Sequence, residues 1–204
     1  MASSPLLSLL LPLLLLAAPA LAAPQPWRDP GSAPRQAVVE AIGDGDSLHV
    51  RAGDQRFTVR LACIDAPELA QAPEGPASHR YLLTRLRRGS RVRLIPHDID
   101  RFGRLVAEVI GGVNLNLALV EDGQAFVDPR HVQHCQAQSY WEAEERAARN
   151  QLGVWQLKGG TERPWLFRAR HRRRHSRAQL PGLPSGLGIG RSTVAPITSG
   201  TPAA

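Results

Sequence analysis

The sequence is short of cysteine, of charge at its start, and of net charge over most of its length. Its two cysteines, Cys63 and Cys135, permit no more than one intrachain disulfide. Residues 1–22 contain no Lys, Arg, Asp or Glu. The formal net charge of +7 lies entirely beyond Phe167, so the first 167 residues are formally neutral. Overall basicity is therefore no argument by itself for a nucleic-acid-binding surface on the folded part of the chain.

The uncharged start has the features of a secretory signal peptide. A nearly unbroken leucine run covers residues 6–16, and Ala20-Leu21-Ala22 is a small-residue cleavage site. No Lys or Arg precedes the run, which leaves the amino terminus as the positive element. The run is shorter than the ~20 residues that span a bilayer, and this disfavours an uncleaved anchor. We expect a signal peptide over residues 1–22, a secreted or periplasmic location, and no membrane span after cleavage.

Two segments outside the expected domain (residues 36–167) have biased compositions. Residues 23–35 are rich in Pro and Ala and are interpreted as a linker. Residues 168–204 are interpreted as a disordered tail that is first basic, then rich in Pro, Gly and Ser. Its basic part can tether polyanions by releasing counterions; a solubilising or lipid-facing tail is the alternative. The excess charge resides in Arg168, Arg170, Arg172, Arg173, Arg174, Arg177 and Arg191.

Alternating apolar and polar residues between these segments predict a mainly β domain. The expected strands are residues 37–42, 47–52, 55–63, 91–96 and 105–110, and the expected helices are residues 76–88, 114–122 and 139–151. Ser139 and Glu142 have the spacing of a capping box at the start of the last helix. The predicted fold class is α+β, with a small five-stranded barrel and three helices. In an oxidising compartment Cys63 and Cys135 can form a bridge from a loop to this barrel; two buried free thiols are the alternative.

Carboxylates and arginines gather where these strands end. Asp44 and Asp46 lie in the first turn, and Asp46 is the expected direct metal ligand. A simple turn is the alternative for this pair. An EF-hand is excluded because His49 stands where its loop needs glycine. Asp65 and Glu68 bracket Pro67 on a rigid corner, where Asp65 can bind a metal ion and Glu68 can activate water.

Two arginines complete the predicted site. Arg60 precedes the corner, and Arg104 follows the tight turn that starts at Asp100. Each guanidinium can make bidentate contacts with phosphate oxygens. An isolated surface ion pair is the alternative for either one, and their joint occurrence favours metal-assisted hydrolysis of a phosphodiester.

From about residue 36 to residue 155 the chain resembles the staphylococcal nuclease-like (thermonuclease) family. Five matches in order carry the resemblance: residues 44–47 (DGDS); Arg60 with residues 64–68 (IDAPE); residues 100–104 (DRFGR); residues 116–120 (NLALV) with 123–125 (GQA); and residues 145–155, which end in LGVW. The resemblance implies an OB-fold barrel and a Ca²⁺-dependent phosphodiesterase that acts on DNA and RNA and leaves 3′-phosphate products.

The resemblance also assigns roles by position. Asp46, Asp65 and the Ala66 backbone carbonyl would bind Ca²⁺ directly, with Asp44 in the outer shell. Glu68 would be the general base, and Arg60 and Arg104 would bind the phosphate.

The chain departs from the family pattern at two places. Ala66 replaces a threonine, which a backbone ligand tolerates. Residues 127–131 lack the tyrosines that stack on the nucleotide; the candidate substitutes are Tyr140, Trp141, His131 and His134.

The sequence thus predicts an exported, monomeric, calcium-dependent nuclease. A catalytically silent OB-type module that binds nucleic acid is the first alternative, although its site residues are intact. A surface or matrix protein whose basic tail carries the function is the second.

Overall fold

The computed structural model describes residues 33–178. The predicted signal peptide, nearly all of the predicted linker, and the tail from residue 179 onward lie outside the described residues. Within residues 33–178, no helix combines the length and apolar character that crossing a membrane requires.

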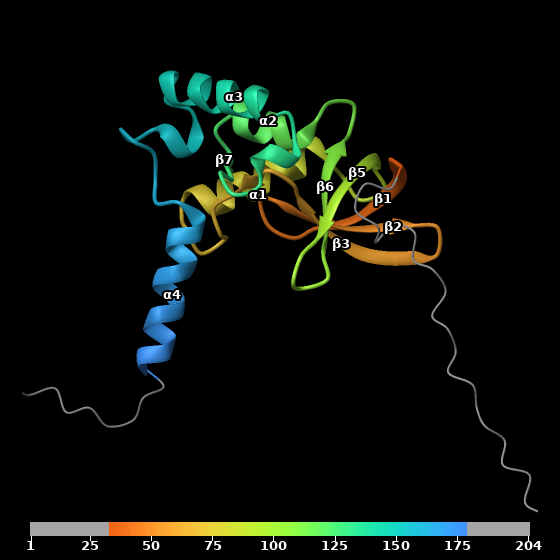
Figure 1. The fold of residues 1–204 in the computed structure, drawn as a ribbon, viewed down its shortest axis with the longest axis horizontal. Coiled ribbons are helices and arrows are strands. Elements are labelled where there is room, and N and C mark those ends of the chain that lie inside the picture. Colours follow the sequence, from red (N-terminus) through yellow and green to blue (C-terminus); the bar gives the residue numbers. More distant parts are fainter. Residues whose placement is uncertain (1–32, 179–204) are drawn as a thin grey trace, which may run out of the picture.

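Five strands form a closed barrel in the order β1-β2-β3-β6-β5 (Figure 1). Their bounds are β1 Arg35–Ile42, β2 Ser47–Ala52, β3 Gln55–Leu61, β5 Arg91–Ile99 and β6 Leu105–Ile110. The β3–β6 pair is parallel and closes the barrel, whereas the other pairs are antiparallel. The predicted α+β class and five-stranded OB-type barrel are confirmed.

Apolar and polar residues alternate along the strands, and the apolar side chains fill the interior of the barrel. Leu48 and Val50 on β2, for example, are fully buried, whereas His49 between them is exposed. A period of two places alternate side chains on opposite faces of a strand, so this pattern fixes the register. The register in turn fixes the functional cleft, because it aligns Ser47 with Arg60 at one end of the β2–β3 pair.

Helices cover one end of the barrel and connect its strands (Figure 1). They are α1 Glu74–Arg85, α2 Leu115–Glu121 and α3 Ala137–Arg149, with short 3-10 turns at Val132–His134 and Gly153–Trp155. Asn116 on α2 ties this layer to the barrel, since its buried amide donates to the carbonyls of Ala62 and Ala107. A two-stranded ladder, β4 Ile64–Asp65 with β7 Phe126–Val127, lies beside them.

The start of α3 was predicted wrongly. Gln136 is its N-cap residue and makes no side-chain cap bond, and the helix begins at Ala137. Ser139 therefore lies inside the first turn, where its backbone N–H donates to the Gln136 carbonyl, and the Glu142 side chain accepts from Gln138. Ser139 and Glu142 therefore have the spacing of a capping box, but they do not form its hydrogen bonds.

A fourth helix, α4 Pro164–Ala178, replaces the first part of the predicted disordered tail. Proline is well suited to the first helical position, and arginine is a good helix former. The start of α4 is also packed, because Trp165 lies edge-on to Phe126 of β7 at 6.4 Å and the Arg163 guanidinium lies 4.1 Å from that ring. The exposed arginines are solvated, as expected, but they are helical rather than extended.

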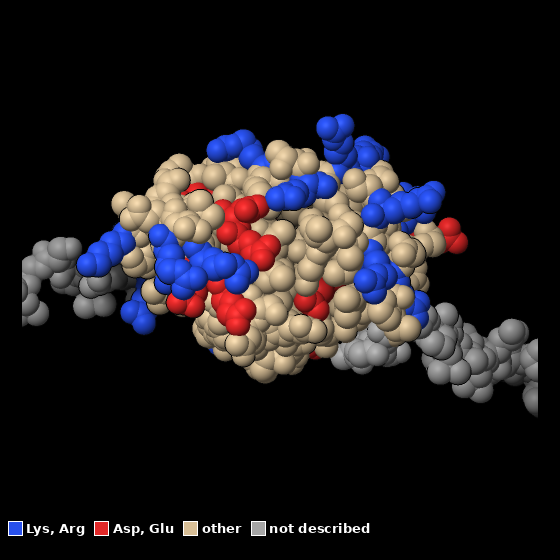
Figure 2. All heavy atoms as spheres, turned by 90° about the horizontal axis from the view of Figure 1, so that it is seen from above, with Lys and Arg blue, Asp and Glu red and all other residues tan. Residues whose placement is uncertain are grey.

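Charges on the folded part are interleaved. Figure 2 shows one face on which acidic and basic side chains lie next to each other, with no uniformly basic surface. This agrees with the formal neutrality of the chain up to Phe167. On this face, affinity for a polyanion must therefore come from particular arginines, and the excess positive charge of the described residues lies on α4.

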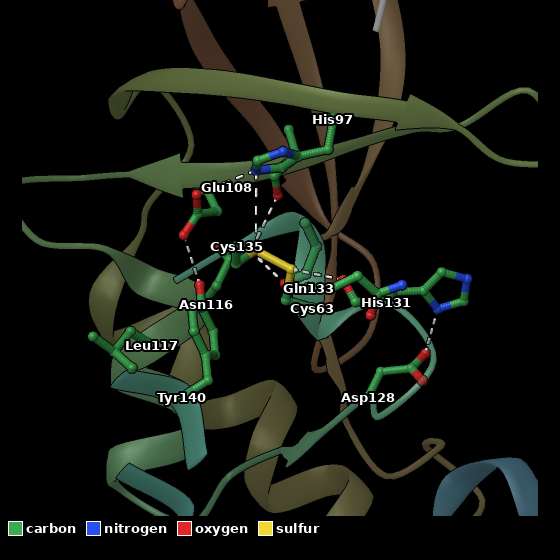
Figure 3. The surroundings of a disulfide bond; sticks show 12 residues. Cys63, His97, Glu108, Asn116, Leu117, Asp128, His131, Gln133, Cys135 and Tyr140 are labelled. Atoms are coloured by element: carbon green, nitrogen blue, oxygen red, sulfur yellow. Dashed lines mark hydrogen bonds and ion pairs between the residues drawn. A yellow bond between two sulfur atoms is a disulfide. The ribbon is translucent and has the colours of Figure 1, made fainter. Parts of the chain in front are cut away.

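Cys63 and Cys135 form a disulfide that links the turn after β3 to the segment before α3 (Figure 3). The two buried free thiols are thus excluded. His97 and Glu108, from β5 and β6, lie beside it, with His97 Nε2 4.0 Å from the Cys135 sulfur and 3.2 Å from Glu108. These three residues have metal-like spacing, but the disulfide occupies the cysteine.

Removing the disulfide is expected to destabilise the fold. The bridge closes a loop with a sequence separation of 72, for which chain-entropy arguments give about 4 kcal/mol. The Cys63→Ala/Cys135→Ala double variant should therefore lose about 2–5 kcal/mol of unfolding free energy in urea titration. Reduced wild-type protein should show a similar loss. An unchanged urea midpoint in both samples would contradict the prediction.

Candidate active site

The first acidic residues are held by the β1–β2 turn. Asp44 Oδ1 accepts hydrogen bonds from the Asp46 backbone N–H and the Ser47 hydroxyl, at 3.1 and 2.7 Å. Gly45 lies so close to Ala66 and Ser78 that an added Cβ would come within 2.9 and 2.7 Å of their Cβ atoms. Asp44 thus stabilises the turn, which is the role that the simple-turn alternative gave it, and it also lines the cleft. Asp46 points inward and is almost fully buried.

Arg60, near the end of β3, joins the two buried aspartates. Its Nη1 donates to Asp46 Oδ1 at 3.0 Å, and its Nη2 donates to Asp65 Oδ1 at 2.9 Å. The other Asp46 oxygen accepts the Ala66 backbone N–H at 2.9 Å. The structure therefore brings together Asp46, Arg60, Asp65 and Ala66 as predicted.

Glu68 lies at the end of the rigid corner after β4. Its backbone N–H donates to Gln71 Oε1, and its carbonyl accepts from the Gln71 backbone. Gly75 approaches this carbonyl so closely that any Cβ would clash with it. The Glu68 side chain is 32% exposed, whereas that of Asp65 is fully buried. The backbone thus fixes Glu68 at the cleft while leaving its carboxylate accessible to water.

A third arginine, Arg168, was predicted only as part of the polyanion-tethering stretch, but it reaches Asp65 and Glu68 from α4. Arg168 Nη1 donates to Asp65 Oδ1 at 3.0 Å and to Glu68 Oε1 at 2.6 Å, and its Nη2 donates to Asp65 Oδ2 at 2.6 Å. Nothing in the sequence distinguishes Arg168 from its neighbouring arginines, apart from its place directly after the aromatic start of α4, Trp165 to Phe167.

The electrostatics of this cluster follow from burial and charge crowding. Burial raises the pKa of Asp46; Arg60 opposes that rise, while the carboxylates of Asp44 and Asp65 add to it. The pKa of Arg60 is raised, chiefly by Asp46. Burial acts to lower the pKa of Arg168, but hydrogen bonds to Asp65 and Glu68 outweigh it and raise the pKa. Both guanidinium groups stay charged, and the raised pKa of Asp46 shows that Arg60 does not fully offset its burial and the neighbouring carboxylates.

The cluster opens into a cleft of about 1000 Å³. Arg104 lines this cleft and donates to Asp100 Oδ2 at 2.7 Å, within a turn where Gly103 adopts a positive φ. Burial raises the pKa of Asp100, but the Arg104 hydrogen bonds outweigh it, so the net direction is downward. Arg104 is thus placed in the predicted cleft but is paired with Asp100.

Only two of the four residues predicted to replace the missing tyrosines line the cleft. His131 and His134 line it, whereas Tyr140 is buried and hydrogen-bonded to Glu108. Trp141 is exposed on α3 and is not part of the cleft lining. Phe102 was not proposed as a substitute, yet it lines the cleft with 69% exposure. Its position in the turn before Arg104 is the sequence feature that could have predicted its place in the cleft.

Two buried aspartates and the partly exposed Glu68 thus lie at a cleft that is lined by several arginines. Such a set of groups suits the class of proteins that hydrolyse phosphodiester bonds with the help of a metal ion, because carboxylates can bind the ion and activate water while arginines bind the phosphate.

Comparison with known proteins identifies the family. A sequence profile described as "Staphylococcal nuclease homologue" matches residues 58–157. A micrococcal nuclease of Shigella flexneri is 35% identical over 140 residues, which cover 64% of this chain and 78% of that protein. An uncharacterized endonuclease of Haemophilus influenzae is 36% identical over 119 residues, 57% of this chain and 64% of that protein. A probable staphylococcal-like nuclease of Oryza sativa subsp. japonica is 31% identical over 115 residues, 56% of this chain and 30% of that protein.

The chain belongs to the staphylococcal nuclease family, and it is a hydrolase of phosphodiester bonds. The matched span ends before α4, so Arg168 lies outside the part of the chain that the family profile covers.

Proposed function

We propose that this protein is an exported, calcium-dependent nuclease that hydrolyses DNA and RNA with little sequence preference and leaves 3′-phosphate ends. The observation that carries the proposal is the Arg60 guanidinium, which joins Asp46 and Asp65 beside Glu68 in one open cleft. The named nuclease relatives support it. The leucine-rich start supports export, and the chain is proposed to act as a monomer.

The residues of the cluster fit a calcium ion. Carboxylate and carbonyl oxygens are the donors that this hard cation prefers, and Asp46, Asp65 and the Ala66 carbonyl would supply them, with Asp44 behind. The buried carboxylates already face two guanidinium groups, which shows that this position accepts positive charge. When bound, the ion would polarise a phosphoryl oxygen.

The protein's own groups would carry the remaining steps. Glu68 orients a water molecule and takes its proton as the oxygen attacks phosphorus. Arg60 donates hydrogen bonds to the phosphate oxygens, where negative charge grows in the transition state. Arg104 leaves Asp100 to reach the same phosphate from the opposite turn. The 5′-oxygen departs and takes a proton from solvent.

Little base preference follows from the residues that line the cleft. Arginines recognise phosphate, which DNA and RNA share, and carry no sequence information. Phe102, His131 and His134 can stack on a base face of any type. The basic residues of α4 would add non-specific affinity for the polyanion, as proposed for the stretch Arg168–Arg177.

Calcium dependence provides the test of this proposal. The purified protein should release acid-soluble nucleotides from single-stranded DNA in calcium and lose this activity in excess EDTA, with recovery when calcium is restored. A few-ligand site predicts a calcium requirement in about the millimolar range. Tight DNA binding without cleavage at any calcium concentration would favour the catalytically silent binding module and contradict the proposal.

A further inference from the structure

Arg168 occupies the position from which a cation would reach the acidic cluster. Both oxygens of Asp65 accept hydrogen bonds from it, and one of its nitrogens also binds Glu68. Asp65 has no exposed surface in this arrangement, while Arg168 itself is 31% exposed. A cation that binds Asp65 from the cleft must therefore displace this guanidinium.

The displaced guanidinium would still face the cleft. Arg168 and Arg172, one turn apart on α4, line the same hollow as Arg60 and Arg104. They also line a second hollow with Leu69 and His171, and Glu68 lines both hollows. The Arg168–Glu68 contact thus lies between two hollows in which α4 presents basic side chains. A polyanion that follows the cleft past Glu68 must pass Arg168.

The start of α4 is fixed firmly enough to keep Arg168 there. Trp165 and Arg163 pack against Phe126, and the backbone N–H groups of Leu166 and Phe167 donate to the Arg163 carbonyl. The long arginine side chain can therefore change partners while its backbone stays in place.

We propose that Arg168 is a further substrate-binding residue: it neutralises Asp65 and Glu68 in the free protein and moves to a phosphate of the nucleic acid when a divalent cation binds. The inference rests on the proposed function. The exchange keeps Glu68 from being held by an arginine when it must accept a proton, since the guanidinium leaves as the cation and the substrate arrive. It also adds a phosphate contact outside the part of the chain that the family profile matches.

The exchange predicts two binding changes of opposite sign in Arg168→Gln. Calcium affinity, measured by calorimetry without nucleic acid, should rise about tenfold, because the ion no longer competes with charge-assisted hydrogen bonds that are partly exposed. Affinity for a cleavage-resistant phosphorothioate oligonucleotide, measured by fluorescence anisotropy in saturating calcium, should fall about tenfold. Arg168→Lys, which keeps the charge and loses the fork, should lie between Arg168→Gln and wild type in both titrations.

Arg149→Gln is the matched control. It removes the same charge from an exposed helical position, but Arg149 lies on α3, pairs with Glu145 and does not line either hollow. Both affinities should stay close to wild type in this variant, and thermal unfolding followed by circular dichroism should confirm that all variants are folded.

The outcomes separate the inference from the function on which it rests. If wild type binds calcium and cleaves DNA, but Arg168→Gln matches Arg149→Gln in either titration, the exchange is wrong and the nuclease stands. A purely structural role for Arg168 would lower both affinities, which also contradicts the exchange. If wild type neither binds calcium nor cleaves, the proposed function itself fails.

Discussion

Glu68→Gln should lower kcat for single-stranded DNA by about 10²–10⁴-fold at saturating calcium, the range expected when a general base is lost. Glutamine keeps the size of the side chain but cannot accept a proton from water. Of the carboxylates that contact the arginines of the cluster, Glu68 combines a 32% exposed side chain with a place on the cleft wall. Asp46 and Asp65 are buried under guanidinium groups and have no comparable access to water.

The readout must separate a base from a metal ligand. Calcium affinity should change little in Glu68→Gln, while kcat falls. A large loss of calcium affinity with kcat recovered at high calcium would instead make Glu68 a ligand. Glu121→Gln is a suitable control, because it makes the same chemical change at an exposed residue paired with Arg146 on the helical layer. Its kcat should equal that of wild type.

Much of the site was predictable because it depends on local sequence at strand ends. The Gly43–Asp46 turn, the register that aligns Ser47 with Arg60, and the Pro67 corner are all short-range features. Alternating apolar residues specify that register, and the register then brings Asp46 close to Arg60 and Asp65. The same reasoning applies to the barrel, whose β2 and β6 have the predicted bounds.

The parts that were missed depend on long-range packing. The helix α4 is stabilised where Trp165 and Arg163 meet Phe126, a contact that composition cannot predict. Without it, an arginine-rich stretch is reasonably interpreted as a solvated, extended tail. Arg168 contacts Asp65 across a sequence separation of 103. Its place in the site could therefore not be predicted without knowing where α4 begins and how it packs. The disulfide was left open for the same reason, since its partners meet only in the folded barrel.

Arg60→Ala should have the second large effect, with a loss of about 10²–10³-fold in kcat/KM. Arg60 is the group that can follow the phosphate through the transition state, because its two terminal nitrogens are held in a fixed fork by Asp46 and Asp65. Arg60→Lys should recover only a small part of the loss, because an ammonium group cannot bridge two carboxylates and a phosphate with the same geometry.

The same variant should also be less stable, which distinguishes Arg60 from a surface arginine. Removing one partner of a buried ion pair costs about 3–5 kcal/mol, and here it leaves Asp46 buried without its guanidinium. Arg56→Ala is the control on the same strand: Arg56 pairs with Glu40 at the surface with 73% exposure, where a pair contributes about 1 kcal/mol or less. Urea unfolding of both variants in EDTA gives the comparison.

The dependence of this instability on pH gives a further check. Burial already raises the pKa of Asp46 in the folded protein, against the opposing effect of Arg60. Without Arg60 that pKa should rise further, so the folded variant binds a proton more tightly than the unfolded chain does. Linkage then makes the stability of Arg60→Ala greatest in acid and lower as the pH rises through the folded pKa of Asp46. A stability deficit relative to wild type that is the same in mildly acidic and mildly alkaline EDTA buffer would show that Asp46 does not depend on Arg60 for its charge.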